Sequence, residues 1–324
     1  MTYPSLHNSP FPGSELTASA QVSPSLKIAV IGDVHDLWES EDRDALHHLG
    51  VDLALFVGDF GNEAVEVVEA IAQLDLPKAA IMGNHDAWYN ATTWGRRKCP
   101  YDPQKENWVQ RQLDALGEAH VGYGKLDLPK LGLSVVGGRP FSWGGPEWKH
   151  EKFYQDWYGV NNAQESIERI VGAVKSTAFF TVLFIGHTGP QGLGDRPEDL
   201  CGRDWRPIGG DYGDPDLAAA IAQARTLGKS VPLVTFGHMH HSLRHRKDRE
   251  REKIAVQDGI VYLNAASVPR IVEKGGDRRR NFSIVQLEHG VVTQCSLIWL
   301  NQQFDIIAEE QLLVHPSQMA QATS

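Results

Sequence analysis

The stretch VGDFGNEAVEVVEAIAQLDLPKAAIMGNHDAWY (57–89) ends two apolar runs in glycine and places metal-binding polar groups just after each glycine. The first run covers 52–59 and ends in Gly-Asp, and the second covers 78–84 and ends in Gly-Asn. Apolar residues recur at helical spacing over 62–74, with Asn62 placed to cap that helix. The order predicts a strand, a helix and a strand, with metal-binding polar groups at the ends of both strands.

The same pattern extends in both directions along the chain. Before this stretch, 27–33 has the composition of a buried strand and 42–50 that of a helix closed by glycine. Later residues predict three further strands (132–138, 178–187 and 232–238), three further helices (104–117, 163–175 and 215–226) and two hairpin turns at Asp258-Gly259 and His289-Gly290. We therefore expect an α/β fold with parallel strands covered by helices.

Length and composition are those of a globular protein, with 324 residues of which 41% are hydrophobic. A chain of this length can share one core, so we expect a single domain over 26–300. It would carry an insertion around 88–158, where six of the nine tryptophans lie. Residues 1–25, rich in Ser, Pro and Thr, predict a disordered leader, and 301–324 a C-terminal tail.

Charge and targeting features exclude several classes of protein. The net charge of −10 argues against nucleic-acid binding through the overall field. No run of about eighteen apolar residues is present, so we expect no membrane span. The leader lacks the basic and apolar regions of a signal peptide, and the three cysteines are far apart. We expect a cytoplasmic protein, and the sequence leaves its oligomeric state open.

Five predicted strand ends share glycine followed by possible metal ligands. These ligands are Asp33 and His35, Asp59, Asn84, His187, and His238 and His240. The carboxyl ends of parallel strands meet at one edge of a sheet, so these side chains should lie together. Carboxylate, imidazole and amide groups suit Mn, Fe, Zn or Co. Seven ligands exceed the need of one ion, which predicts two ions roughly 3.5–4 Å apart with a shared carboxylate.

These motifs, D-x-H, GD, GNHD, GH and GHxH in this order, resemble those of the calcineurin-like metallophosphoesterases over about 27–290. The resemblance implies a four-layer α-β-β-α sandwich. It implies one divalent or trivalent ion held by Asp33, His35 and His240, another held by Asn84, His187 and His238, and Asp59 bridging both. It also implies that His85 faces the substrate without binding metal, oriented by Asp86.

The implied enzyme is a metal-dependent phosphoesterase. Two cations lower the pKa of a shared water, and the bridging hydroxide attacks phosphorus in line. His85 would give a proton to the leaving oxygen, with Asp86 raising the pKa of His85.

A small-molecule phosphomonoester or nucleotide is the first candidate substrate. A cyclic nucleotide or other phosphodiester comes second and a phosphoprotein third. A metallophosphoesterase-fold scaffold without turnover is the alternative from another class, although the complete ligand set argues against it. A Rossmann dehydrogenase is excluded, because no GxGxxG follows the first strand.

Other polar residues admit both a functional and a structural interpretation. Arg139 and Arg270 could bind the substrate phosphate or form ordinary ion pairs. Asp36 could support His35 or sit in a turn. His241, Asn264 and Ser267 favour structural roles.

Two charged runs and the tryptophan-rich span also admit two interpretations each. The runs 244–253 and 274–280 favour solvated turns over a basic rim that steers an anion. The tryptophan-rich span could form a cap whose rings stack on a base or sugar, or a packing layer over the sheet.

Overall fold

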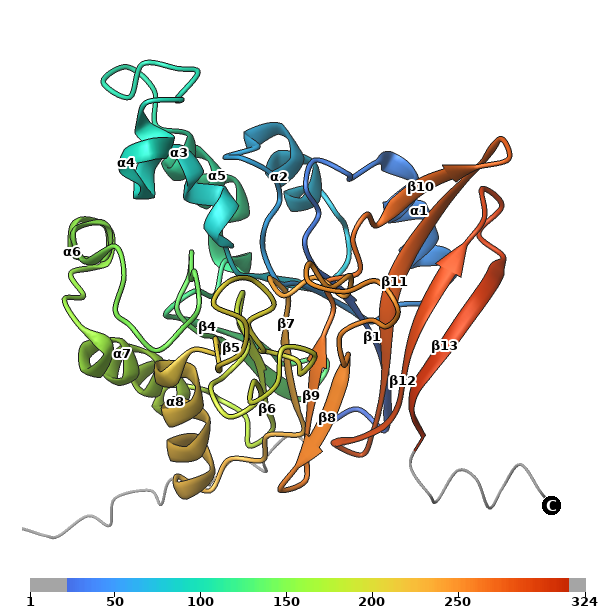
Figure 1. Cartoon of the computed structure of the whole chain (residues 1–324). Helices are drawn as coiled ribbons and strands as arrows, with labels where there is room; N and C mark the ends of the chain where they lie inside the picture. The colour runs from blue at the N-terminus through green and yellow to red at the C-terminus, as the bar shows by residue number, and fades with distance from the viewer. Residues whose placement is uncertain (1–21, 315–324) are drawn as a thin grey trace, which may run out of the picture.

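A computed structural model of the chain describes residues 22–314 and contains two facing β-sheets (Figure 1). The first sheet has the strand order β13-β12-β11-β1-β2-β3, with β10 beside β11. Its strands are β1 (Ser25–Ile31), β2 (Leu53–Phe56), β3 (Lys78–Ala80), β10 (Ile271–Lys274), β11 (Asp277–Glu288), β12 (Val291–Leu300) and β13 (Ile306–Val314). The second sheet has the order β4-β5-β6-β7-β9-β8. Its strands are β4 (Lys125–Leu128), β5 (Leu133–Gly137), β6 (Val182–Ile185), β7 (Leu233–Phe236), β8 (Ile254–Gln257) and β9 (Ile260–Asn264).

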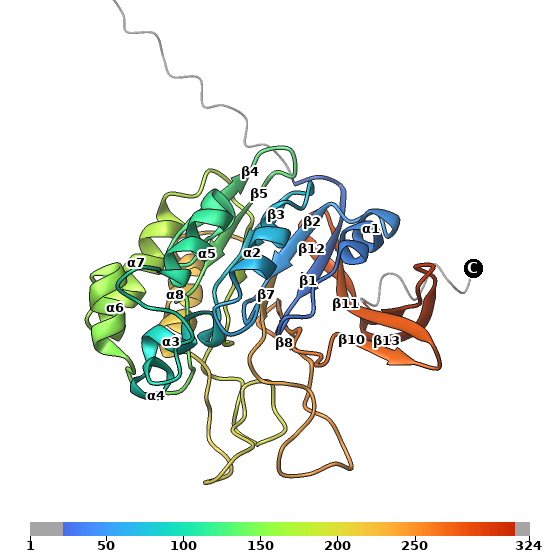
Figure 2. The ribbon, with the colours of Figure 1, turned by 90° about the horizontal axis from the view of Figure 1, so that it is seen from above.

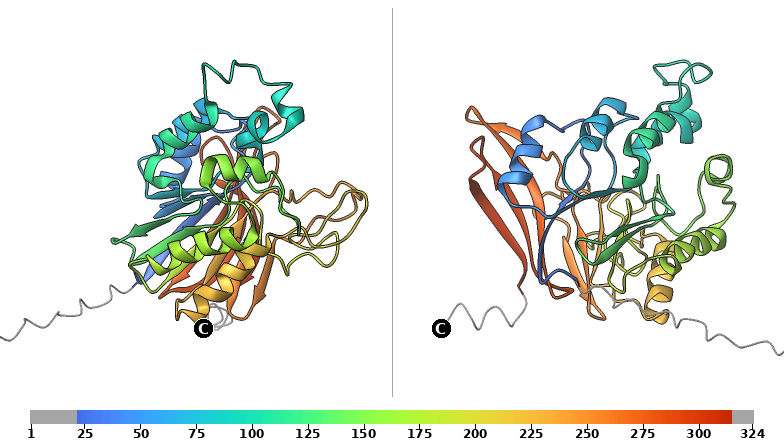
Figure 3. Two further views of the ribbon diagram at one scale, coloured as in Figure 1. Left: turned by 90° about the vertical axis from the view of Figure 1, so that its left-hand side faces the viewer. Right: turned by 180° about the vertical axis from the view of Figure 1, so that it is seen from behind.

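Helices cover the outer face of each sheet and complete four layers (Figure 3). The first sheet packs against α1 (Ser40–His48), α2 (Val65–Ala72) and α5 (Trp108–Leu116). The second packs against α7 (Ala163–Lys175) and α8 (Pro215–Thr226). The shorter helices are η1 (Asn84–Ala87), α3 (Trp88–Ala91), α4 (Thr93–Arg96), η2 (Gly117–Ala119) and α6 (Glu151–Tyr158). The predicted α-β-β-α architecture is confirmed.

The central strands are apolar on both faces because each face has its own core. In β1, Ile28 and Val30 point into the core between the sheets. Ala29 and Ile31 point into the core beneath the helices, as the two-residue period of a strand requires. Such double burial explains the continuous apolar runs of the sequence. β1, β2 and β3 are parallel, and so are β5, β6, β7 and β9.

Several predicted elements agree closely with the structure. The predicted helices at 163–175 and 215–226 have the bounds of α7 and α8. Both predicted hairpins form, and each turn has two residues with positive φ, the geometry that favours Asn, Asp and Gly. The φ values are 51° and 79° at Asp258-Gly259, and 49° and 80° at His289-Gly290.

Other predictions need correction. β13 lies within the predicted C-terminal tail and pairs antiparallel with β12. The predicted insertion around 88–158 includes β4 and β5, which belong to the second sheet. Asn62 does not cap a helix, because α2 begins at Val65. The leader lies outside the described residues up to position 21, and the domain bounds stay predictions. No helix within 22–314 has the length and apolar character needed to cross a membrane.

His120, beside β3, makes the fold sensitive to acid. Its Nε2 is buried without a hydrogen-bond partner among the described residues, and burial lowers the pKa of His120 to about 4. The unfolded chain therefore binds a proton near pH 6.5 that the folded chain does not. Stability should fall as the pH drops from 6.5 toward 4, by at most about 1.4 kcal/mol per pH unit from this group.

His120→Phe should remove that contribution. Urea unfolding at several pH values between about 4 and 7.5 measures the free energy of unfolding of both proteins. The two proteins share all their other titrating groups. We therefore expect the free energy of unfolding of the variant, relative to that of the wild type, to increase as the pH falls. A difference that stays constant over this range would contradict the assignment.

Candidate metal centre

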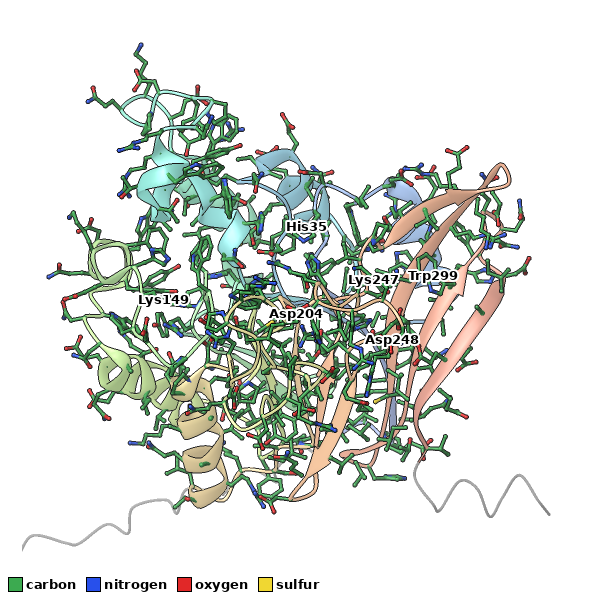
Figure 4. All side chains as sticks on the ribbon, viewed as in Figure 1. His35, Lys149, Asp204, Lys247, Asp248 and Trp299 are labelled. Carbon is green, nitrogen blue, oxygen red and sulfur yellow. The ribbon has the colours of Figure 1, made fainter. Side chains whose placement is uncertain are left out.

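All seven predicted ligands come together where β1, β2, β3, β6 and β7 end. Asp33 and His35 follow β1, Asp59 follows β2, Asn84 follows β3, His187 follows β6, and His238 and His240 follow β7. His35 marks this region in Figure 4. Two of the ends belong to the second sheet, so both sheets contribute ligands.

The first cluster consists of Asp33, His35 and His240. The Nε2 atoms of the two histidines are 3.2 Å apart, and His240 Nε2 lies 3.4 Å from Asp33 Oδ1. The backbone N–H of His238 donates to Asp33 and holds its carboxylate in place. Two imidazole nitrogens and a carboxylate oxygen facing one point are a donor set for a transition-metal ion.

The second cluster consists of Asp59, His187 and His238, with Asn84 beside them. His187 Nε2 lies 3.2 Å from Asp59 Oδ1 and 3.0 Å from Asn84 Oδ1. His187 Nδ1 donates to the Val57 carbonyl at 2.8 Å, which turns Nε2 toward the cluster. The residues present therefore fit a second metal ion.

The Asp59 carboxylate lies between the two clusters. One oxygen is near His187, and the other is 4.0 Å from His35 Nε2 in the first cluster. Burial alone would raise the pKa of Asp59, but the imidazole charge of His187 and its hydrogen bond outweigh burial and hold that pKa well below its usual range. An ionised carboxylate in this place is suited to bridge two cations.

Strained backbone positions the ligands at the strand tips. Asp33, His35, Asp59 and His238 have φ values of 49°, 44°, 55° and 65°, a region that costs a non-glycine residue about 1–3 kcal/mol. Gly83 is required by space, because a Cβ there would lie 2.3 Å from Asp59 Oδ1. The glycines before the ligands thus allow the close approach of neighbouring strand tips.

His85 is oriented by Asn62, which corrects the predicted role of Asp86. His85 Nδ1 lies 2.7 Å from Asn62 Oδ1. The buried Asp86 carboxylate instead accepts the backbone N–H groups of Asp59, Phe60 and Gly83, at 3.0, 2.8 and 2.6 Å. It ties the tips of β2 and β3 together, because η1 turns it inward. Burial lowers the pKa of His85, the opposite of the predicted direction.

The sequence did contain a signal for Asn62. It lies three residues after Asp59 in the loop that leaves β2, close to the second ligand motif. Because the sequence predicted a helix cap at Asn62, it did not predict that Asn62 orients His85.

Arg139 and Arg270 are held in buried ion pairs, which corrects their predicted substrate contacts. Arg139 lies 2.5 Å from Asp214, and its guanidinium stacks on Trp148. Arg270 lies 2.8 Å from Asp42. Both side chains are more than nine-tenths buried. Removing one partner from such a buried pair is strongly destabilising. Both arginines therefore have a structural role.

The remaining polar candidates also act within the fold. His241 is buried, and its Nε2 lies 3.0 Å from the Asn264 carbonyl. The Asn264 amide donates to the Met239 carbonyl at 2.7 Å and so supports the loop that carries the ligands after β7. The N–H of Asp36 donates to Phe60, in keeping with a turn carboxylate.

A cavity of about 430 Å³ opens beside the candidate metal centre. Its lining includes His85, His238 and His240, and beyond them Trp88, Trp143, Lys149, Trp205, Tyr212 and Arg244. Trp88 and Trp143 come from the tryptophan-rich span, which therefore reaches the site. Trp205, Tyr212 and Arg244 come from the long loops after β6 and β7, which extend together from the body (Figure 2).

Arg251 joins these two loops. Its buried guanidinium donates to the carbonyls of Pro197, Asp199 and Gly202 at 3.0, 2.8 and 2.7 Å, and its Nε donates to the His240 carbonyl. Six of the ten residues in the charged run 244–253 are exposed, in keeping with the favoured solvated turn, and Arg251 and Lys253 are the buried ones. The run 274–280 forms the turn between β10 and β11, where Arg278 and Arg280 pair with Glu39.

A comparison with protein families agrees with this arrangement. A family model described as calcineurin-like phosphoesterase matches residues 26–242. Among solved structures, a dimetal phosphatase from Danio rerio is 12% identical, with 90% of this chain and 100% of that chain covered and a TM-score of 0.44. Protein TT1561 of Thermus thermophilus is also 12% identical, with 89% and 99% covered and a TM-score of 0.44. A comparison with curated protein sequences gives no match.

Proposed function

The chain belongs to the calcineurin-like phosphoesterase family, and from that premise we propose that it hydrolyses a small-molecule phosphomonoester or nucleotide at a centre of two metal ions. One observation carries the proposal: seven ligand side chains converge in two clusters, with Asp59 between them. Because this ligand set is complete, we favour an enzyme over a scaffold without turnover.

The donor types define which ions the clusters would hold. Asp33, His35 and His240 would hold one ion, Asn84, His187 and His238 the other, and Asp59 would contact both. Mixed nitrogen and oxygen donors suit Mn, Fe, Zn or Co. Bound ions would supply positive charge at the phosphate and lower the pKa of a water molecule.

His85 is the group of the chain placed to handle the leaving oxygen. It lines the cavity beside Asn84, and Asn62 holds its Nδ1. With Nδ1 occupied, Nε2 is the atom that can give a proton to the departing alkoxide when the ring is protonated. Trp88 stacks on the ring at 4.6 Å and limits its rotation. In this proposal Asn62 is a positioning residue.

The cysteines support an intracellular location within the same proposal. Cys99, Cys201 and Cys295 are free thiols, and Cys201 and Cys295 are buried. Free cysteines are usual in reducing compartments.

Metal content and hydrolysis of two model esters test the proposed function. We expect the purified chain to bind two ions, and to hydrolyse p-nitrophenyl phosphate faster than bis(p-nitrophenyl) phosphate in the presence of Mn²⁺. A faster reaction with the diester would indicate a phosphodiesterase instead of a phosphomonoesterase. Two bound ions with neither ester hydrolysed would favour the scaffold, and a chain that binds no metal would overturn the assigned centre.

A further inference from the structure

We infer that the cavity beside the metal centre selects phosphate compounds that carry both a planar ring and a second anionic group, the chemistry of a nucleoside diphosphate. Water would cleave its terminal phosphoanhydride bond and release inorganic phosphate and the nucleoside monophosphate. The inference rests on the proposed function, because the scissile phosphate would occupy the metal centre. It goes further in assigning the rest of the cavity to two recognition surfaces, one aromatic and one both cationic and aromatic.

The aromatic surface is a row of stacked rings that begins at the centre. His85 and Trp88 are stacked with ring centroids 4.6 Å apart and planes 13° from parallel. Trp88 and Trp143 continue the row at 5.6 Å and 21°. All three side chains line the cavity and are half-buried, so their remaining surface is available to a ligand. Such a row favours a flat ring over a flexible alkyl group.

The second surface combines aromatic rings with two cations. Trp205 and Tyr212 pack edge to face at 4.8 Å. The Arg244 guanidinium lies 5.5 Å from the Trp205 ring, and Lys149 Nζ lies 5.0 Å from the Tyr212 ring. All four line the same cavity. Lys149 and Asp204 can be seen in Figure 4.

These two cations lack the carboxylate partners that the neighbouring charges have. Within residues 22–314, neither Lys149 nor Arg244 forms an ion pair. Among the described residues that line the cavity, Asp204 is the only carboxylate outside the metal clusters; it lies 3.4 Å from Arg251 and accepts the backbone N–H of Arg244 at 2.7 Å. The charge of Asp204 is therefore already balanced, and the wall keeps two positive groups for an anion.

The walls are fixed in place before any ligand binds. Arg251 holds the loops after β6 and β7 to each other through buried hydrogen bonds. The N–H of Gly145, close to Trp143, donates to the Tyr212 carbonyl at 2.8 Å and joins the two surfaces. A volume of about 430 Å³ lies within the usual range for small-ligand sites of about 300–1,000 Å³. A folded protein substrate would not enter such a space.

Four probes distinguish the contribution of the planar ring to substrate recognition from that of the second anionic group. They are adenosine diphosphate, adenosine monophosphate, pyrophosphate and glycerol phosphate, tested for phosphate release by the Mn²⁺-loaded enzyme. We expect kcat/KM to be highest for the diphosphate and lower for the monophosphate. Glycerol phosphate should fall at least about tenfold below the monophosphate, as expected from the loss of base stacking.

Variants assign each preference to its surface. Trp143→Ala, in the aromatic row, should lower the preference for adenosine monophosphate over glycerol phosphate about tenfold, and Trp143→Phe should restore most of it. Arg244→Gln should lower only the preference for the diphosphate over the monophosphate. Lys152→Gln is the matched control, since Lys152 is exposed and pairs only with Asp156 among the described residues.

Binding measured apart from turnover keeps the inference distinct from the proposed function. Titration calorimetry with adenosine diphosphate and glycerol phosphate gives the affinity ratio whether or not the ester is cleaved. Tighter binding of the diphosphate that Trp143→Ala and Arg244→Gln both weaken supports the inference even if hydrolysis is absent. Equal affinities and equal kcat/KM values for all four probes would overturn it, although hydrolysis itself would then uphold the proposed function.

Discussion

Asp59→Asn is expected to lower kcat/KM for p-nitrophenyl phosphate by at least about 10³-fold and to reduce bound metal from two ions toward one. The carboxylate faces both clusters, with one oxygen near His187 and the other near His35. An amide keeps the shape but offers one neutral oxygen, so it cannot balance two cations. Metal analysis of the purified variant and steady-state kinetics measure the two effects.

Asp75→Asn is the matched control, because Asp75 is exposed and pairs with His47 on the surface. We expect wild-type metal content and activity from it. The Asp59 carboxylate also accepts the backbone N–H of His85, so thermal unfolding of the metal-free proteins must show whether the variant folds. A folded Asp59→Asn protein with two ions and near-normal turnover would remove Asp59 from the bridging position.

His85→Ala is expected to lower kcat by about 10²- to 10⁴-fold while both ions stay bound, because in the proposed function His85 acts on the leaving oxygen rather than on the metals. The loss should depend on the leaving group. An alkyl phosphate releases a strongly basic alkoxide that needs a proton, whereas p-nitrophenolate is a stable anion. We therefore expect the larger loss for the alkyl ester, measured as the ratio of kcat values for the two substrates.

His48→Ala provides the control, since His48 is an exposed residue of α1 and does not line the cavity. A His85→Ala protein that loses metal would show that His85 supports the ligands instead. Equal losses for alkyl and aryl esters, with two ions retained, would contradict proton transfer to the leaving oxygen and leave His85 a role in binding the phosphate.

The convergence of the seven candidate ligands could be predicted from the sequence because each motif is local. Glycine before a polar residue at the end of an apolar run marks a strand tip, and parallel strand tips meet at one edge. Buried central strands and helices such as α7 and α8 were equally predictable, since apolar periodicity reports burial on one or both faces. β13 was missed because six of its nine residues are exposed, so it lacks that periodicity.

Contacts between side chains that lie far apart in the sequence were determined only by the tertiary structure. Whether Arg139 faces a phosphate or a buried carboxylate depends on Asp214, 75 residues away, and no local pattern connects them. Asn62 reaches His85 across 23 residues only because β2 and β3 are neighbours. The same holds for the cavity wall, where Arg251 binds carbonyl groups of the loop after β6 and brings Trp205 and Arg244 to the centre.

The sequence by itself determined the layered fold and the chemistry at the strand tips, because apolar periodicity and ligand type are properties of short segments. The tertiary structure alone decided which side chain orients His85, which arginines are buried in ion pairs and what surrounds the substrate cavity. Those choices depend on contacts between loops, and a loop carries no periodic pattern from which its partners could be inferred.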